Sequence, residues 1–209
     1  MVRKGTNKAH KRNKAANARL QQISRVAATL FFEKGYMQTT TKEIAEACNI
    51  SVGTLYYYIK SKDDFPVIFS EIHKHHIDKW EKKVRKEMYD VSPEEILRKA
   101  VREFVYGVDK RQKMILFWYN VSRYLNREQL RGIIDVETRV VALFKEIIEL
   151  GCKQGRFKTV DPFVTGYNIM MVCHTWALKH WWLKSLYTIE QYAKMCEELA
   201  VSMARGNSI

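Results

Sequence analysis

The chain has 209 residues, 46% of them hydrophobic, and a formal net charge of +13. This length allows one or two domains with a proper core, and no run approaches the ~20 uncharged apolar residues of a membrane span. The charge is uneven, because residues 1–62 carry 12 lysines and arginines against three glutamates, and such a surface attracts the phosphate backbone of nucleic acids.

The N-terminus is basic and lacks the apolar segment of a secretory signal, so a cytoplasmic protein is expected. Residues 1–17 contain no acid and no sustained apolar period. They are predicted to form a disordered basic arm, which either settles against DNA or only solubilises the chain. The cysteines are far apart in the sequence and are expected to be free thiols: Cys48, Cys152, Cys173 and Cys196.

A first helix is predicted from about Ala18 to Lys34, because apolar side chains recur there every three or four residues. Gly35 ends it, as glycine does where the residue after a helix needs a positive φ. Two short helical patterns follow, from Thr41 to about Cys48 and from about Val52 to Ile59.

The two short helices are joined by a tight turn at Asn49 and Ile50, with Ile50 expected to point inward as an apolar plug. Thr41 and Ser51 are the expected N-caps, because a hydroxyl accepts a bond from a free N–H of the first helical turn. Helices this short are not stable alone in water and must pack on a third. The pattern therefore predicts a helix-turn-helix, whose second helix enters the DNA major groove.

The segment GYMQTTTKEIAEACNISVGTLYYYIKSKDDF resembles the DNA-binding region of TetR-family transcriptional repressors. The close match covers about Ala18 to Phe69, and the remainder matches only in length and helical pattern. The resemblance implies an all-α protein of about nine helices. Residues 18–64 would form a three-helix DNA-binding domain with the helix-turn-helix, and residues 65–209 a larger helical domain for ligand binding and dimerisation.

By family position, the resemblance also implies the residues that contact duplex DNA, which are Thr41, Lys42, Val52, Gly53, Thr54, Tyr56, Tyr58 and Lys62. Thr41 and Lys42, at the start of the first short helix, would reach the phosphate backbone together with Lys62. Those of the second short helix would face base edges or adjacent phosphates. Since Val52 and Gly53 bring no side-chain hydrogen-bond donor into the groove, shape and phosphate contacts are expected to carry more of the specificity.

The next helix is predicted from Ser61 to about Met88, with Pro66 tolerated near its first turn. The resemblance implies that this helix links the two domains and tilts when a ligand binds. Its His73 and His76 share one helix face and could hold a metal with Asp78 or Glu81. An exposed or boundary histidine group is the favoured interpretation, so no metal site is predicted.

Five further helices are predicted, at about residues 92–109, 111–125, 127–150, 161–186 and 188–204. The last two carry more apolar surface than one small bundle can easily bury. The resemblance implies that they form a homodimer interface, which would place two recognition helices about one turn of DNA apart.

The expected effector is a small and largely apolar molecule bound between helices of the larger domain. The candidate lining and head-group residues are Phe104, Met114, Phe117, Trp118, Tyr119, Arg123, Met170, His174, Trp176 and Lys179, although each apolar one is also explained as ordinary core. The segment HTWALKHWWLKSLYTIEQY is similar to the C-terminal region of TetR-type repressors that respond to acyl-coenzyme A. Basic residues at the opening of the effector cavity would suit the phosphates of acyl-coenzyme A. Arg139 and Lys184 are further candidates for this role.

Two effector classes stay open: an acyl-coenzyme A linked to fatty-acid metabolism, or an aromatic or lipophilic compound that induces an efflux or detoxification gene. No cofactor is expected. An enzyme is disfavoured, because the sequence has no Gly-rich phosphate loop, no HExxH and no GxSxG motif. An RNA-binding protein is disfavoured by the lack of RRM or KH signatures.

Overall fold

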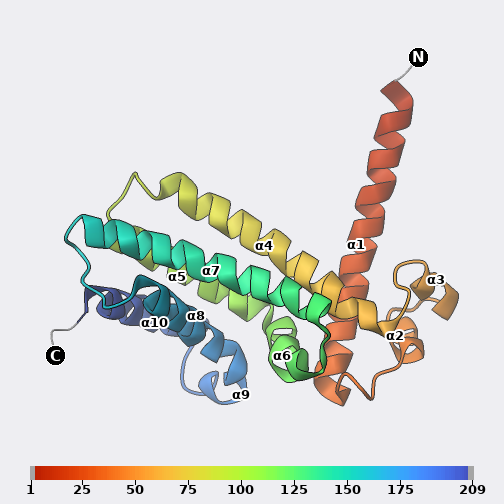
Figure 1. The fold of residues 1–209 in the computed structure, drawn as a ribbon. Coiled ribbons are helices and arrows are strands. Elements are labelled where there is room, and N and C mark those ends of the chain that lie inside the picture. The colour runs from red at the N-terminus through yellow and green to blue at the C-terminus, as the bar shows by residue number, and fades with distance from the viewer. Residues whose placement is uncertain (1–2, 207–209) are drawn as a thin grey trace. The chain divides into compact units, whose positions relative to one another are not determined.

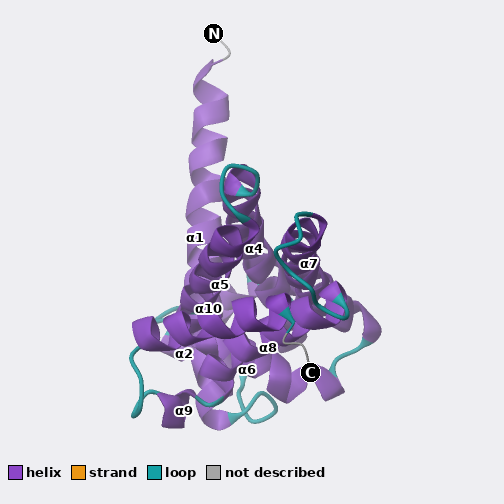
Figure 2. Cartoon of the chain, turned by 90° about the vertical axis from the view of Figure 1, so that its left-hand side faces the viewer, coloured by secondary structure: helices purple, strands orange, loops and turns teal. Residues whose placement is uncertain are grey.

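Within residues 3–206, which the structure describes, the computed structural model has ten α-helices, two short 3-10 helices and no β-strand (Figures 1 and 2). Of residues 3–14 only the backbone is described. The all-α prediction is confirmed. The chain divides into two compact units between Ile72 and His73, inside α4, whereas the sequence placed the boundary between residues 64 and 65. No helix in this range is long and apolar enough to span a membrane.

The N-terminal unit contains α1 (Arg3–Lys34), α2 (Thr41–Ala47), α3 (Val52–Tyr56), the 3-10 helix η1 (Lys62–Asp64) and the first part of α4 (Phe65–Glu87). In it α1 packs on α2, and α2 packs on α3. Neither α2 nor α3 is long enough to be stable alone, so both depend on the core that they share with α1 and α4.

Three phenylalanines form the centre of this core. The ring centroid of Phe31 lies 5.5 Å from that of Phe65 and 6.2 Å from that of Phe69. Ile44 of α2 and Leu55 of α3 are completely buried, so each short helix contributes an apolar side chain to the interior. This packing fixes the α2–α3 pair in the N-terminal unit.

The start of α1 differs from the prediction. The helix extends back to Arg3, whereas the sequence indicated a disordered arm over residues 1–17 and a helix start at Ala18. Positions 1 and 2 of that arm lie outside the described residues. Alanine, lysine and arginine dominate the segment, and they are among the best helix formers, so a helix is favoured even without an apolar stripe.

The C-terminal unit contains the rest of α4 and six further α-helices, which are α5 (Pro93–Lys110), α6 (Gln112–Val121), α7 (Arg127–Lys153), α8 (Pro162–Leu178), α9 (His180–Leu183) and α10 (Ile189–Arg205), with the 3-10 helix η2 (Ser122–Tyr124) after α6. Helix α5 packs on α10, α7 and α8, and α8 also packs on α7 and α10.

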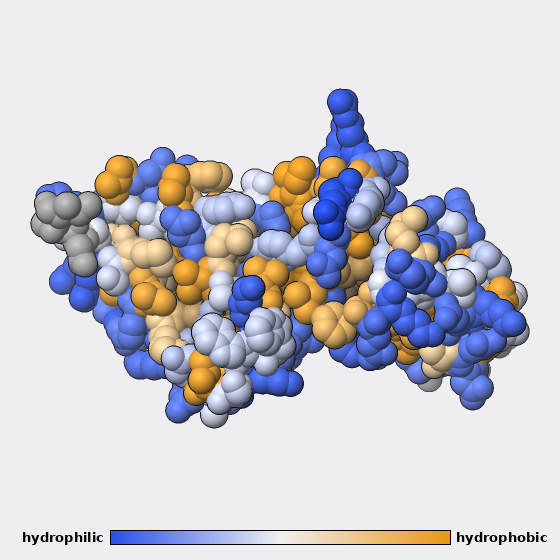
Figure 3. All heavy atoms as spheres, turned by 90° about the horizontal axis from the view of Figure 1, so that it is seen from below, coloured by the Kyte–Doolittle hydropathy of each residue, from blue (hydrophilic) through white to orange (hydrophobic). Residues whose placement is uncertain are grey.

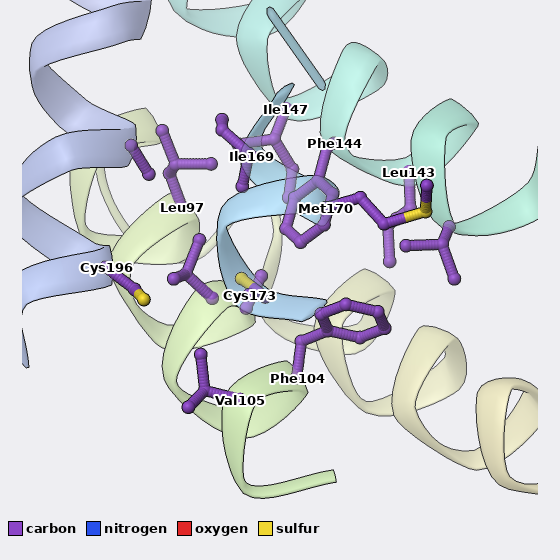
Figure 4. Packing of buried hydrophobic residues seen from close by; sticks show 14 of the residues in the cluster. Leu97, Phe104, Val105, Leu143, Phe144, Ile147, Ile169, Met170, Cys173 and Cys196 are labelled. Carbon is purple, nitrogen blue, oxygen red and sulfur yellow. The ribbon is translucent and has the colours of Figure 1, made fainter. Parts of the chain in front are cut away.

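The core of this unit lies where α5, α7, α8 and α10 meet. Figure 4 shows Leu97, Phe144 and Cys173 converging there from α5, α7 and α8. The indole of Trp80 joins α4 to the same core, because its ring centroid lies 5.1 Å from that of Phe104 and its Nε1 donates to the carbonyl of Ala100 at 3.2 Å. All four cysteines are free thiols, as predicted.

The predicted helix over residues 161–186 is broken, which explains why ten α-helices stand in the described range where about nine were predicted. The chain turns at Lys179 (φ −119°, ψ 21°), and α9 begins at His180. No proline or glycine marks this point, and apolar residues continue across it, so the sequence carries no stop signal.

Candidate DNA interface and effector site

Helix α2 begins with a capping box, and its N-cap lies one residue before Thr41, the predicted cap. Thr40, not Thr41, is the N-cap: its hydroxyl accepts from the backbone N–H of Glu43 at 3.2 Å, and its own N–H donates to the Glu43 carboxylate at 2.8 Å. The hydrogen bond from Lys34, at 2.7 Å, and that from Thr40 lower the pKa of Glu43 to about 2. Glu43 stands three residues after Thr40, which is the spacing that the box requires.

The turn between α2 and α3 is compact. Asn49 has φ 52°, a left-handed conformation that asparagine tolerates better than most residues, and the N–H of Ile50 donates to the carbonyl of Ala45 at 3.0 Å. Ile50, predicted to point inward as an apolar plug, is half-buried.

Helix α3 is capped by Ser51, as predicted. The Ser51 hydroxyl accepts from the N–H of Thr54 at 3.0 Å and lies 2.8 Å from the Thr54 hydroxyl. Because the Thr54 hydroxyl is engaged by Ser51, the methyl group of Thr54 is the part of the side chain that remains available for an apolar contact.

The outward face of α3 is small and open. Val52, Gly53, Thr54 and Tyr56 are exposed, while Leu55 is completely buried. A Cβ added at Gly53 would meet only the Ser51 hydroxyl, at 3.8 Å, so the protein itself does not require glycine there. Four of the predicted DNA-contact residues therefore share one accessible surface.

Three other predicted contact residues surround this surface. The hydroxyl of Thr41 lies 3.4 Å from that of Tyr56, so the start of α2 is next to α3. The Lys42 side chain is 77% exposed and has only a 3.9 Å contact with Glu46. Tyr58 is half-buried, and its ring centroid lies 5.2 Å from that of Tyr57.

Lys62 has a role that the sequence analysis did not anticipate. Its ammonium donates to the backbone carbonyls of Tyr36, Met37 and Thr39 at 2.8, 3.2 and 3.1 Å. An ammonium has three protons, so a phosphate contact would require breaking one of these bonds. The structure places Lys62 as the residue that holds the loop between α1 and α2.

The predicted effector residues fall into two groups. Phe104, Met114, Phe117, Trp118, Met170, His174 and Trp176 are buried in the C-terminal unit. Tyr119, Arg123, Lys179 and Lys184 are exposed. Arg123 stacks on Tyr124 instead of facing the interior. Arg139 is engaged by Asp78 and Glu81 at 2.6 and 2.5 Å, so its charge is already neutralised.

His174 joins several of these residues. Its Nδ1 lies 3.0 Å from the Tyr119 hydroxyl, and its ring stacks on Phe104 with centroids 5.6 Å apart. Burial lowers the pKa of His174 to about 4, so the ring is neutral at pH 7. Trp176, by contrast, donates to Asp109 at 2.7 Å, which is a structural contact between α8 and the end of α5.

The sequence analysis missed Arg111, which lies between α5 and α6. Burial lowers the pKa of its guanidinium to about 10, and no carboxylate of the described chain forms an ion pair with it. In the sequence it stands in the run DKRQK, where charged residues are usually solvated. Only packing reveals that this one is largely buried.

The histidines of α4 show no metal-binding arrangement. Asp78 and Glu81, the carboxylates considered as further ligands, both bind Arg139. Among the residues whose side chains are described, no three His, Cys, Asp or Glu groups come together as a metal site. His73 is buried rather than exposed, and burial, with the charge of Arg111, lowers its pKa to about 3.

Apolar side chains remain exposed on α8 and α10. Phe163, Val164 and Tyr167 of α8 are 52%, 52% and 42% exposed, and Leu199 of α10 is 50% exposed. In the view from below, orange and pale orange side chains are spread over the C-terminal unit, on the side where Figure 1 places these helices (Figure 3). A groove of about 510 Å³ on α10 is lined by none of the predicted effector residues.

Two family models match the chain. The one described as bacterial regulatory proteins of the tetR family matches residues 23–65, and the one described as a tetracyclin repressor-like C-terminal domain matches residues 90–203. Among curated proteins, the chain is similar to the HTH-type transcriptional regulator HbdR of Aromatoleum sp. (strain CIB). The two are 29% identical over 182 residues, which cover 87% of this chain and 78% of HbdR.

Solved structures show the same fold. A regulatory protein of the tetR family from Rhodococcus RHA1 matches with a TM-score of 0.79 and 23% identity, covering 91% of this chain and 98% of that one. AibR, solved in complex with isovaleryl coenzyme A and operator DNA, matches with a TM-score of 0.69 and 26% identity. That match covers 87% of this chain and 97% of AibR.

Proposed function

Because this chain belongs to the TetR family, and is therefore a DNA-binding transcriptional regulator, we propose that it represses transcription as a homodimer on a pseudo-palindromic operator. A small, largely apolar effector binds the C-terminal unit and releases the dimer from DNA. The family consists of regulators and not of enzymes, in agreement with the sequence.

The exposed face of α3 carries the proposal. Leu55 anchors the helix in the core, while Val52, Gly53, Thr54 and Tyr56 face outward. Small residues let the helix backbone approach base edges, and the tyrosine hydroxyl can bond a phosphate or a base. Thr41 and Lys42 extend this surface to the neighbouring phosphates, and Tyr58 lies at its edge. Lys62 supports this surface indirectly, because it holds the loop that precedes α2.

The homodimer is proposed to form through α8 and α10. Both helices bury one side in the core and leave the apolar residues Phe163, Tyr167 and Leu199 exposed on the other. A two-fold dimer would present two α3 helices to successive major grooves, ~34 Å apart. The shared operator then supplies the affinity that one helix-turn-helix unit lacks.

The effector is proposed to be an acyl-coenzyme A or a related lipophilic molecule. Support comes from the apolar interior around Phe104, Met170 and His174, and from the likeness to AibR, a protein that binds isovaleryl coenzyme A. An aromatic or lipophilic inducer of an efflux gene is the alternative, because the same residues would also surround a neutral guest.

The test is selection of duplexes from a random DNA library by the purified full-length protein. The proposal predicts one enriched sequence with two-fold symmetry, protected over both half-sites in a hydroxyl-radical footprint. Bulk duplex and RNA should compete at least about a thousandfold less well. A single, asymmetric half-site, or equal competition by RNA, would contradict the proposal.

A further inference from the structure

Five polar side-chain atoms of the described C-terminal unit are buried without a hydrogen-bond partner. Two are Nη1 of Arg98 and Nδ1 of His180, and the other three are Nδ1 of His73, Nε of Arg111 and Nε2 of His174. These three come from α4, from the α5–α6 junction and from α8. The charges of Arg111 and His174 both lower the pKa of His73, so the three groups lie within electrostatic range of one another. Buried polar groups are nearly always satisfied, and three orphans in one cluster require an explanation.

The charge of the cluster is unbalanced. Arg111 forms no ion pair with a described carboxylate, and the only influence on its pKa is burial, which lowers it. The nearest acid in sequence, Asp109, is occupied, because its Oδ1 accepts from Gln112 and from Trp176, each at 2.7 Å. A guanidinium that is largely removed from water without a counter-charge destabilises the free protein.

The helix beside Arg111 is shaped to admit its side chain. A Cβ built at Gly107, in the interior of α5, would lie 2.5 Å from Nη2 of Arg111. Glycine costs a helix about 1 kcal/mol relative to alanine. Here it provides the space in which the guanidinium lies across α5.

His174 adds a buried ring nitrogen, Nε2, that has no partner. The Tyr119 hydroxyl lies 3.0 Å from Nδ1 and 3.4 Å from Sδ of Met171, to which it also donates in the other tautomer. An anion beside Nε2 selects the tautomer in which Tyr119 donates to Nδ1 and the neutral ring carries its proton on Nε2. The ring also stacks on Phe104, so a polar donor adjoins apolar core. This combination suits an amphipathic molecule with an apolar tail and an anionic head.

We infer that the effector carries an anionic oxygen head group, and that Arg111, His174 and His73 bind it inside the C-terminal unit. The inference rests on the proposed effector-responsive function and specifies the chemistry of the effector. The head group is a carboxylate or a phosphate, and a neutral lipophilic compound is excluded. Because His73 lies on α4, which continues into the DNA-binding unit, the bound anion touches the helix that links the two units.

The first arm of the test needs no ligand. Arg111→Met removes an unpaired buried charge but keeps an unbranched apolar stem as far as the position of Nε, so it should melt at a higher temperature than the wild type. Arg123→Met, which removes an exposed arginine stacked on Tyr124, is the control and should change the melting temperature little. If Arg111 only stabilises the C-terminal end of α5, Arg111→Met will melt at a lower temperature, and the inference is overturned.

The second arm uses two chain lengths, 3-methylbutanoate and hexadecanoate, each as free acid, coenzyme A ester and neutral alcohol. An acid or an ester should raise the melting temperature of the wild type, and the alcohols should not. The active form then identifies the head group as carboxylate or phosphate. Arg111→Met should weaken that binding by about tenfold or more, which is the loss expected for a charged hydrogen bond, and Arg123→Met should not.

A further variant displaces the guanidinium of Arg111 without removing its charge. Gly107→Ala places a methyl group where Nη2 lies, so it should weaken ligand binding while the helix remains intact. The inference is overturned if the alcohols raise the melting temperature of the wild type as much as the acids or esters do, or if no acid or ester raises it. Neither result touches the proposed binding of a two-fold operator, which the DNA experiment tests by itself: no selected duplex, a single asymmetric half-site or equal competition by RNA contradicts it.

Discussion

Gly53 is the residue on α3 whose importance depends on DNA rather than on the fold. It is exposed, its φ is not positive, and an added Cβ would meet only the Ser51 hydroxyl at 3.8 Å. Gly53→Ala should therefore keep or raise stability, by up to about 1 kcal/mol. It should weaken operator binding by about tenfold or more, because the methyl group would stand between α3 and the groove.

Thermal melting and a binding titration of the selected duplex check this prediction. Asn120→Ala, an exposed substitution on α6 of the C-terminal unit, is the control for a change in helix propensity outside the DNA-binding unit. If Gly53→Ala bound the operator as tightly as this control, α3 would not approach the DNA through that position.

Lys62 is predicted to act on stability. Its ammonium bonds three backbone carbonyls and lies 4.8 Å from the ring centroid of Tyr36. Lys62→Ala should lower the free energy of unfolding by about 1–3 kcal/mol, as measured by urea denaturation.

Lys60→Ala, the change of an exposed neighbour, should stay within about 0.5 kcal/mol of the wild type. The salt dependence of operator binding separates the two roles of Lys62. A log–log slope reduced by about one in Lys62→Ala, with unchanged stability, would restore Lys62 as a phosphate contact.

The two residues whose structural roles were not expected from the sequence share a physical cause. Lys62 and Arg111 both stand in charged runs, where a solvated side chain is the normal outcome. Their roles depend on acceptors or burial supplied by distant segments: the carbonyls of residues 36–39 for Lys62, and helix α5 with α4 for Arg111. Local pattern cannot reveal such partners.

At the scale of elements, the exposed faces of α8 and α10 predict a dimer that one charged residue can weaken. Leu199→Glu puts a carboxylate on the exposed face of α10, where the free subunit tolerates it because Leu199 is 50% exposed. In a dimer the charge would be buried without a partner, at a cost of several kcal/mol. The dimer should dissociate at concentrations at which the wild type remains associated.

Sedimentation equilibrium measures this change. Trp181→Glu, on the exposed side of α9, is the control and should leave the association constant unchanged. Dissociation by Trp181→Glu but not by Leu199→Glu would move the interface to α9.

Most elements could be predicted because their ends carry local signals. Ser51 caps α3, as predicted, and Ser92, Asp161 and Thr188 cap helices that begin within a residue of the predicted starts at 92, 161 and 188. The misplaced elements lack such signals. The start of α1 has no apolar stripe, and only the helix propensity of its residues favours it. The break at Lys179 has neither proline nor glycine.

For the whole molecule, the buried histidines predict a loss of stability in mild acid. His73 and His174 have pKa values of about 3 and 4, well below their ordinary 6.5, because both rings are buried. Arg111, His76 and His174 face His73 and add to its shift. The unfolded chain takes up protons first, so stability is complete above pH 6.5 and falls between pH 6.5 and about 4.

The shift of His174 alone corresponds to a loss on the order of 3 kcal/mol at pH 4. Urea denaturation at a series of pH values measures it, and His174→Gln should remove its share of the slope. His75→Gln, at an exposed position on α4, is the control and should keep the wild-type slope. If the free energy of unfolding of His174→Gln fell with acid as steeply as that of the wild type, the His174 ring would titrate as it does in the unfolded chain.

The central claim concerns the whole assembly: two copies of this chain bind one operator and leave it when the effector binds. Native mass spectrometry of the protein with the selected duplex tests it most directly. The account predicts one complex of two chains and one duplex, which separates into free DNA and a ligand-bound dimer when the active acid or ester is added. A single chain on the duplex, or a protein–DNA complex that keeps its mass as ligand binds, would contradict it.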